Sequence, residues 1–173
     1  MSKTLESRRT VRMKNIEIFE ALSGLLFAEL YEYFPLPKTI DPKRLALELG
    51  DEYWDEAEQP LEETGQINAY VRHKSPAGLA EPTIRWLANT GFITFDGYRG
   101  GEFQNVCLTA KGLEAIRSAP GRESRLLNAA KNIVAGAAKD SARDELRKVF
   151  SEMVLWSVQN SATLIQSASN FGG

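Results

Sequence analysis

One helix-to-strand junction constrains this chain more than any other feature. A helical pattern over residues 82–90, with Pro82 in its first turn, stops at Gly91. The next four residues, 92–95, are β-branched or aromatic and predict a strand. A glycine just past a helix adopts the left-handed conformation at little cost, which turns the chain directly into the strand. The sequence therefore predicts a helix that runs into a sheet without a long loop.

The same strand is predicted to form one arm of a hairpin. Turn residues fill positions 96–101, and an alternating apolar pattern over 102–109 predicts the returning strand. Thr109 is then a candidate N-cap for a helix over 110–118. The predicted hairpin is thus preceded and followed in the chain by a helix.

Two helices are predicted before this unit. The first covers residues 15–34, where apolar side chains recur at three- and four-residue spacing behind Asn15 as the expected N-cap. The second is short and well bounded, because Asp41 is suited to the N-cap and Pro42 to the first turn, and Gly50 ends it. The structure of residues 51–75 is left open.

Residues 122–170 predict one long C-terminal helix or two. Between residues 146 and 158 the pattern is apolar on almost every face, so such a helix must be buried from several sides. We expect a second copy of the chain to cover it; the alternative is that it packs back on its own domain. The residues expected to mediate oligomerisation are Leu146, Val149, Phe150, Met153 and Trp156.

Charge is segregated along the chain although the net charge is only −2. Residues 1–14 carry five basic side chains and one acidic one, which predicts a basic N-terminal arm. Residues 51–63 carry seven acidic side chains and no basic one, so we interpret 51–75 as an acidic insertion in a domain that spans 15–118. The net negative charge of the chain disfavours binding to nucleic acid. A basic arm can still bind it, because binding responds to the local charge and not to the sum over the chain.

Composition excludes several other classes of protein. A single cysteine, Cys107, and a single histidine, His73, leave no disulfide framework and no Cys/His zinc site. No set of side chains forms a recognisable catalytic constellation, so we expect neither an enzyme nor a bound cofactor or metal. No stretch of about 20 apolar residues is present, and the N-terminus is unlike a secretory signal, so we expect a cytoplasmic protein that does not span a membrane.

The two edges of the hairpin carry a family resemblance. Residues 87–93 read L-A-N-T-G-F-I and residues 108–116 read L-T-A-K-G-L-E-A-I. At these positions the chain resembles winged-helix domains of the MarR- and PadR-type bacterial regulators, in motif over 84–116 and in element order over 15–118. The resemblance implies a mainly α (α+β) fold: a winged helix-turn-helix domain with a two-stranded wing and appended long C-terminal helices.

The resemblance also implies a dimeric transcriptional regulator that binds double-stranded DNA. Its third helix would enter the major groove, and the tip of its hairpin would touch the backbone or the minor groove. The residues that this mapping assigns to DNA are Thr83, Arg85, Trp86 and Asn89 on the helix, Arg99 at the hairpin tip, Lys74 and Lys111 beside them, and Arg8 and Arg9 in the basic arm.

A different reading makes the same domain a protein-interaction module or an accessory subunit that does not bind DNA. Glu81 would repel phosphate, and Trp86 is a large apolar group where a polar side chain is expected. This reading predicts a protein partner bound through Trp86 or the wing, with an apolar patch around Trp86 or Tyr98 and no continuous basic surface. A third hypothesis is a ligand pocket between the wing domain and the C-terminal helices, lined by Trp54, Tyr70 or Trp156.

Overall fold

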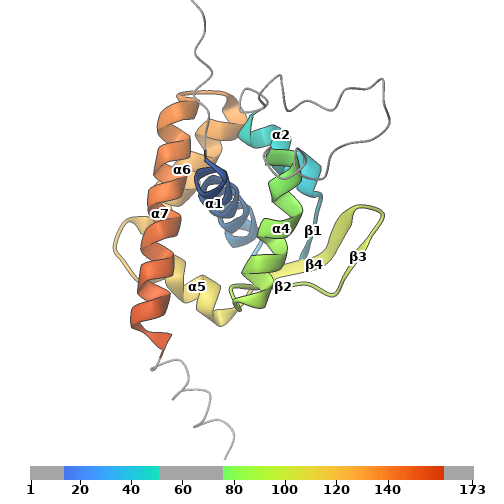
Figure 1. Ribbon diagram of the computed structural model, residues 1–173. Coiled ribbons are helices and arrows are strands. Elements are labelled where there is room, and N and C mark those ends of the chain that lie inside the picture. Colours follow the sequence, from blue (N-terminus) through green and yellow to red (C-terminus); the bar gives the residue numbers. More distant parts are fainter. Residues whose placement is uncertain (1–13, 51–75, 162–173) are drawn as a thin grey trace, which may run out of the picture.

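The computed structural model describes residues 14–50 and 76–161. Within them the chain is mainly helical with a small antiparallel sheet, which confirms the α+β prediction (Figure 1). The helices are α1 (Asn15–Tyr33), α2 (Pro42–Leu49), α4 (Pro76–Asn89), α5 (Ala110–Arg117), α6 (Arg122–Ala135) and α7 (Lys139–Gln159). The strands are β1 (Lys38–Ile40), β2 (Ile93–Thr94), β3 (Gly97–Arg99) and β4 (Glu102–Leu108).

Local signals place most helix ends where the sequence predicts them. At the start of α2, the Asp41 side chain accepts a hydrogen bond from the Lys43 backbone N–H at 2.9 Å. At the start of α5, Thr109 accepts one from the Gly112 N–H at 3.2 Å. The helix α1 differs slightly, because its N-cap is Lys14, whose N–H donates to the Glu17 carboxylate at 2.7 Å. These caps satisfy N–H groups that have no partner inside their helices.

The helix α4 begins earlier than predicted. It starts at Pro76 and continues through Pro82, which we expected to lie in its first turn. Pro82 is exposed, whereas Ala80, Ile84 and Leu87 are fully buried on the opposite side. One missing N–H costs the helix a single backbone hydrogen bond, and the burial of this apolar face outweighs that loss.

The sheet centres on β4. Its order is β1-β4-β2, and β3 also pairs with β4. Tyr98 of β3 lies opposite Phe103, and Ile93 of β2 lies opposite Leu108. Three of the residues expected to form the turn, Gly97–Arg99, are therefore the strand β3, and the tip of the hairpin is Gly100 and Gly101, both with positive φ. The strand β1 was not predicted, because three residues are too short to show an alternating pattern.

The helix α1 forms the centre of the molecule. Every residue from Ala21 to Ala28 is buried, and Figure 1 shows α1 between α7 and α4. A Cβ added at Gly24 would lie 2.8 Å from the Leu146 carbonyl oxygen, so α1 and α7 cross at backbone distance. One cluster of buried residues joins all six helices of the described part to the sheet.

The C-terminal segment forms two helices, α6 and α7, packed as a hairpin across residues 136–138. The side chains of Leu146, Val149, Phe150 and Met153 are at most 2% exposed within the single chain. Phe150 packs on Phe19 and Phe27 of α1, with ring centroids 5.4 and 6.0 Å apart. The prediction that a second copy covers these four side chains is therefore wrong, because they are already buried within the single chain. Trp156 is half-buried against the same core.

Candidate nucleic-acid interface

The junction between α4 and the sheet is held by the residues of the second motif. Gly91 leaves α4 with φ of +82°. The Thr109 hydroxyl lies 2.5 Å from the Gly91 carbonyl oxygen, and Lys111 Nζ donates to the Thr90 carbonyl at 2.6 Å. A Cβ at Gly112 would overlap the carbonyl oxygen of Phe92, so α5 approaches this turn too closely for any side chain. The turn that follows α4 is therefore shaped or held by all four residues: Gly91, Thr109, Lys111 and Gly112.

Lys111 is consequently engaged within the fold. Its ammonium group also lies 4.3 Å from the centre of the Phe92 ring, so it is held by a carbonyl and an aromatic face together. This geometry gives Lys111 a structural role, and its contact with DNA stays a prediction. The motif that carries the family resemblance is explained here by packing alone.

Arg85 projects from the outer face of α4 but is already paired. Its Nε and Nη2 donate to Glu81 Oε1 at 3.1 and 3.0 Å. Its guanidinium carbon lies 5.2 Å from the Tyr98 ring centre and 5.3 Å from that of Phe103. Arg85 therefore joins the helix to the hairpin, and Glu81 neutralises its charge. We call Glu81, Arg85 and Tyr98 the junction cluster.

The Tyr98 hydroxyl completes this cluster. It lies 3.5 Å from Glu81 Oε2. Desolvation raises the pKa of Tyr98, and the negative charge of Glu81 raises it further, so the hydroxyl keeps its proton at neutral pH. The sequence predicts an apolar patch around Trp86 or Tyr98 but not the contact between Tyr98 and Glu81, because these residues are 17 apart in the chain and only the hairpin brings them together.

Trp86 and Asn89 also face outward on α4, whereas Thr83 does not. Trp86 is 41% exposed, and its inner edge packs against Phe19 with ring centroids 5.1 Å apart. Thr83 is only 3% exposed and donates its hydroxyl to the Leu79 carbonyl at 2.7 Å. The prediction that Thr83 faces DNA is wrong, because it shares the buried side of α4 with Ile84 and Leu87.

Arg99 lies at the tip of the hairpin and is exposed, as predicted. It is opposite Glu102 in the strand register, and Asp96 lies exposed at the base of β3. The hairpin therefore offers one cation between two acids. Other predicted positions, Lys74, Arg8, Arg9, Trp54 and Tyr70, lie outside the described residues.

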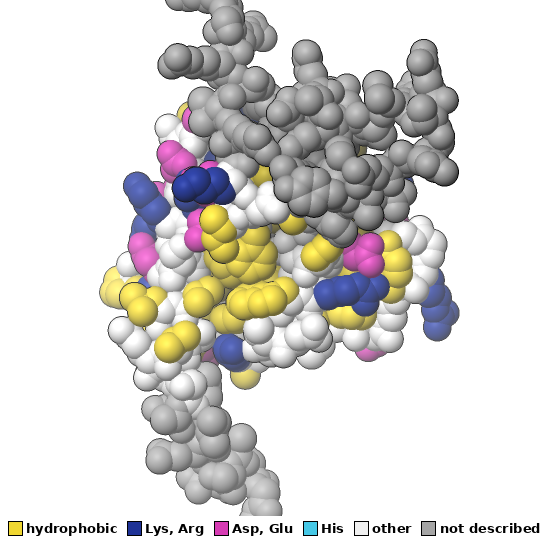
Figure 2. Space-filling view, viewed as in Figure 1, with side chains coloured by type: hydrophobic (Ala, Val, Ile, Leu, Met, Phe, Trp, Pro, Cys, Tyr) yellow, Lys and Arg dark blue, Asp and Glu magenta, His cyan; other side chains and the backbone are white. Residues whose placement is uncertain are grey.

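Figure 2 shows how these side chains are distributed on one face of the molecule. Basic side chains over α4 and the hairpin lie beside acidic ones, and an apolar area fills the space between α7 and α4. Phe19 of α1 and Trp86 of α4 pack together, and Trp86 is 41% exposed. Among the described residues of this face, no continuous basic surface is present.

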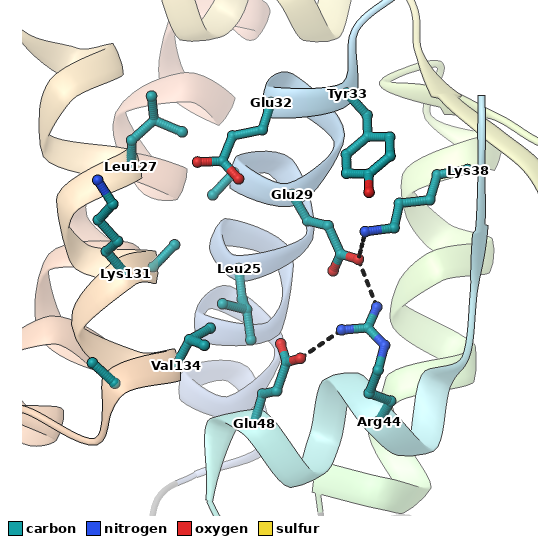
Figure 3. A pocket seen from close by; sticks show the side chains of 13 residues that line it. Leu25, Glu29, Glu32, Tyr33, Lys38, Arg44, Glu48, Leu127, Lys131 and Val134 are labelled. Carbon is teal, nitrogen blue, oxygen red and sulfur yellow. Dashed lines mark hydrogen bonds and ion pairs between the residues drawn. The ribbon is translucent and has the colours of Figure 1, made fainter. Parts of the chain in front are cut away.

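A pocket of about 480 Å³ lies elsewhere, between α1, β1, α2 and α6 (Figure 3). Its lining combines apolar side chains of α1 and α6 with charged ones of α1, β1 and α2. They include Leu25, Ala28, Leu127, Ala130 and Val134 on the apolar side, and Glu29, Lys38, Arg44 and Glu48 on the charged side. The sequence predicted a pocket lined by Trp54, Tyr70 or Trp156, and Trp156 does not line this one.

The charged side of the pocket is an ion-pair ladder. Burial lowers the pKa of Arg44, but its hydrogen bonds and charge interactions with Glu29 and Glu48 outweigh this and raise it. The guanidinium therefore stays charged.

No group of three or more potential metal ligands is present among the described residues. No helix in this part of the chain is long and apolar enough to cross a membrane.

The comparisons with known proteins assign no family. No protein-family model, no curated protein and no solved structure gives a significant match to this chain. The geometry of α4, the hairpin and the pocket is therefore what bears on the function of this chain.

Proposed function

We propose that this chain is a winged-helix DNA-binding protein that acts as a dimeric transcriptional regulator. The observation that carries the proposal is the contact between Arg85 of α4 and Tyr98 of the hairpin, which joins an exposed helix face to an exposed hairpin. A helix that enters the major groove and a hairpin that reaches the backbone must be held in one orientation. The junction cluster provides that link.

The outer face of α4 offers side chains suited to reading base edges. Arg85 and Asn89 are exposed, and their side chains carry the paired donors and acceptors that recognise guanine and adenine. Arg99 at the hairpin tip is placed to meet a phosphate. In this proposal Glu81 orients Arg85 in the free protein and lowers its affinity for phosphate at the same time.

The small number of cations limits the affinity of one copy for DNA, because phosphate contacts supply most of the binding free energy. A dimer doubles these contacts and places two α4 helices about 34 Å apart for successive major grooves. Leu155 and Val158 of α7, 58% and 66% exposed and three residues apart on one face, are the side chains that we propose to pair two copies. They replace the four buried residues named from the sequence.

A second candidate function is protein recognition through the same face. Trp86 is 41% exposed beside Phe19, and exposed tryptophans are frequent anchors at protein interfaces. The paired state of Arg85 also favours a partner that requires little positive charge. In this reading the chain is an accessory subunit and does not bind nucleic acid.

Fluorescence anisotropy with a random-sequence DNA duplex distinguishes the two candidates. We expect the full chain to bind at low salt and to weaken as salt rises, because groove-reading domains show a non-specific electrostatic affinity. Arg85→Ala and Arg99→Ala should each weaken binding and lower the salt slope by about one phosphate contact. The control is Arg117→Ala, which removes the same charge from an exposed position on α5.

Absence of binding at low salt would overturn the DNA proposal and favour protein recognition. Equal loss in the Arg117 control and in the α4 and hairpin variants would also overturn it, because only net charge would then matter. The protein-recognition reading would next be tested by partner capture, with Trp86→Ala as the variant that should lose the partner.

A further inference from the structure

We propose that the pocket between α1, β1, α2 and α6 binds a small amphipathic amine, whose apolar body packs against α6 and whose ammonium group binds Glu29. The site shares no residue with the outer face of α4 or with the hairpin. Binding of a ligand in this pocket therefore does not depend on whether the chain binds DNA.

The apolar side of the pocket is built for the body of a ligand. Leu127, Ala130 and Val134 recur at three- and four-residue spacing, so they line one face of α6. They face Leu25 and Ala28 of α1 across the pocket (Figure 3). Val134 is 68% exposed, so apolar surface is left uncovered here. A volume of about 480 Å³ falls within the usual range for small-molecule sites.

Glu29 dominates the charged side because it is the most enclosed of these groups, with its side chain 13% exposed. Lys38 Nζ and Arg44 Nη2 both lie 2.6 Å from Glu29 Oε1. Among the described residues, no group donates to the second oxygen, Oε2. Glu48 repeats this arrangement, since its Oε1 accepts from Arg44 Nη1 at 2.6 Å and its Oε2 accepts from no described residue.

The cations of the same wall are already engaged. Both terminal nitrogens of Arg44 are used by Glu29 and Glu48. The Lys38 ammonium is shared between Glu29 and the face of Tyr33, 4.0 Å from the ring centre. Figure 3 shows this ladder along the right-hand wall. The wall therefore has free carboxylate oxygens, whereas each of its two cations, Lys38 and Arg44, is already paired with a carboxylate.

A ligand that brings hydrogen-bond donors suits the free carboxylate oxygens of this wall. A primary amine supplies three, and a charged donor makes the stronger hydrogen bond to a carboxylate. Lys131, exposed on the α6 rim, would instead favour an acid, but solvent screens the charge of an exposed side chain. Glu29 is better desolvated, so its charge acts in a lower dielectric and dominates the choice of ligand.

The test uses three probes that share one apolar body: 4-phenylbutylamine, 4-phenylbutanol and 4-phenylbutyrate. Isothermal titration calorimetry on the full chain should give saturable binding of the amine, about tenfold weaker binding of the alcohol, and the weakest binding for the acid. Ala130→Phe should abolish amine binding, because the new ring fills the apolar side. Circular dichroism of each variant checks that the fold is retained.

Glu29→Gln should remove the preference for the amine over the alcohol while the alcohol still binds. Because Glu29 also holds Lys38 and Arg44, Glu48→Gln is a second variant on the same wall and should reduce the preference in part. Glu114→Gln removes an exposed carboxylate from α5 and is the matched control, for which no change is expected. Equal or tighter binding of the acid would overturn the proposal. So would failure of all three probes to saturate, or amine binding that survives Ala130→Phe.

Discussion

Arg143, on α7, donates two hydrogen bonds to the backbone carbonyl oxygen of Leu49, the last residue of α2. The distances are 2.8 Å from Nε and 2.6 Å from Nη2. The carbonyl groups of a last helical turn have no partner within the helix and carry partial negative charge, which a guanidinium satisfies well. Arg143 is 1% exposed and also pairs with Asp140 at 3.1 Å. The C-terminal hairpin thereby holds α2 in place.

This relationship predicts that Arg143→Met destabilises the fold strongly. Methionine retains much of the apolar stem but leaves the Leu49 carbonyl without its two donors, at a cost of about 2–4 kcal/mol in the free energy of unfolding. Chemical denaturation followed by circular dichroism measures this cost. The control is Arg147→Met, one turn further along α7, whose partners Glu17 and Glu20 are partly exposed. Its expected cost is below about 1 kcal/mol, and an equal cost for the two variants would contradict the capping role.

Gly112→Ala should destabilise the chain more than glycine-to-alanine changes usually do. The new Cβ would overlap the Phe92 carbonyl oxygen, so either α5 or the turn after α4 must shift, at a cost of about 2 kcal/mol or more. Gly97→Ala is the matched control, because it has no positive φ and no atom within 4 Å of an added Cβ. Thermal unfolding of both variants checks the difference. A neutral Gly112→Ala would mean that the α5 contact is looser than described.

Glu81→Gln should strengthen DNA binding if the proposed function holds. The substitution keeps the size of the side chain and removes the charge that neutralises Arg85. We expect binding to tighten about threefold to tenfold, since one like charge is lost near the phosphates. Anisotropy against the same duplex measures it, with Glu114→Gln as a control for net charge. Unchanged affinity in Glu81→Gln would show that Arg85 does not face DNA.

Lys111→Met should lower stability and leave DNA affinity unchanged. The ammonium group is held by the Thr90 carbonyl and by the Phe92 ring, so its loss leaves a helix end without a donor. We expect a cost of about 1–2 kcal/mol in the free energy of unfolding. Denaturation and anisotropy on the same preparation separate the two effects. A loss of DNA affinity at unchanged stability would instead support the contact between Lys111 and DNA that the family resemblance implies.

Leu155→Glu combined with Val158→Glu should convert a dimer to a monomer. Both side chains are mostly exposed in the single chain, so their replacement costs little within it. Sedimentation equilibrium of the wild type and the double variant measures the change in mass. Val134→Glu, an equally exposed apolar position on α6, is the control and should leave the mass unaltered. A wild type that is already monomeric, or a double variant that stays dimeric, would contradict this interface.

The elements that the sequence predicted well are those with local causes. Asp41, Pro42 and Gly50 bound α2, and Thr109 caps α5, because each acts on backbone groups within a few residues. Gly91 turns α4 into the hairpin through its own φ of +82°. Such features depend on conformational preferences of neighbouring residues, so they can be deduced without any knowledge of the fold.

The errors fall where the cause is a contact distant in sequence. The strand β1 exists because β4 pairs with it, and Pro82 lies inside a helix because the opposite face of α4 is buried. A periodic pattern shows that the face of α7 around Leu146 must be covered, but it does not say by what. The helix α1 of the same chain covers it, and Gly24, which has no side chain, allows α1 to approach α7 this closely.

The same distinction between local and distant causes applies to the residues of the candidate site. By itself the sequence determined which residues are basic, aromatic or polar, and that Arg85, Trp86 and Asn89 share a helix with its hairpin close behind. Only the tertiary structure decided that Lys111 is engaged by a carbonyl, that Thr83 is buried and that Glu81 and Tyr98 hold Arg85. The physical reason is that side-chain charge is a local property, whereas its neutralisation depends on partners that folding brings together.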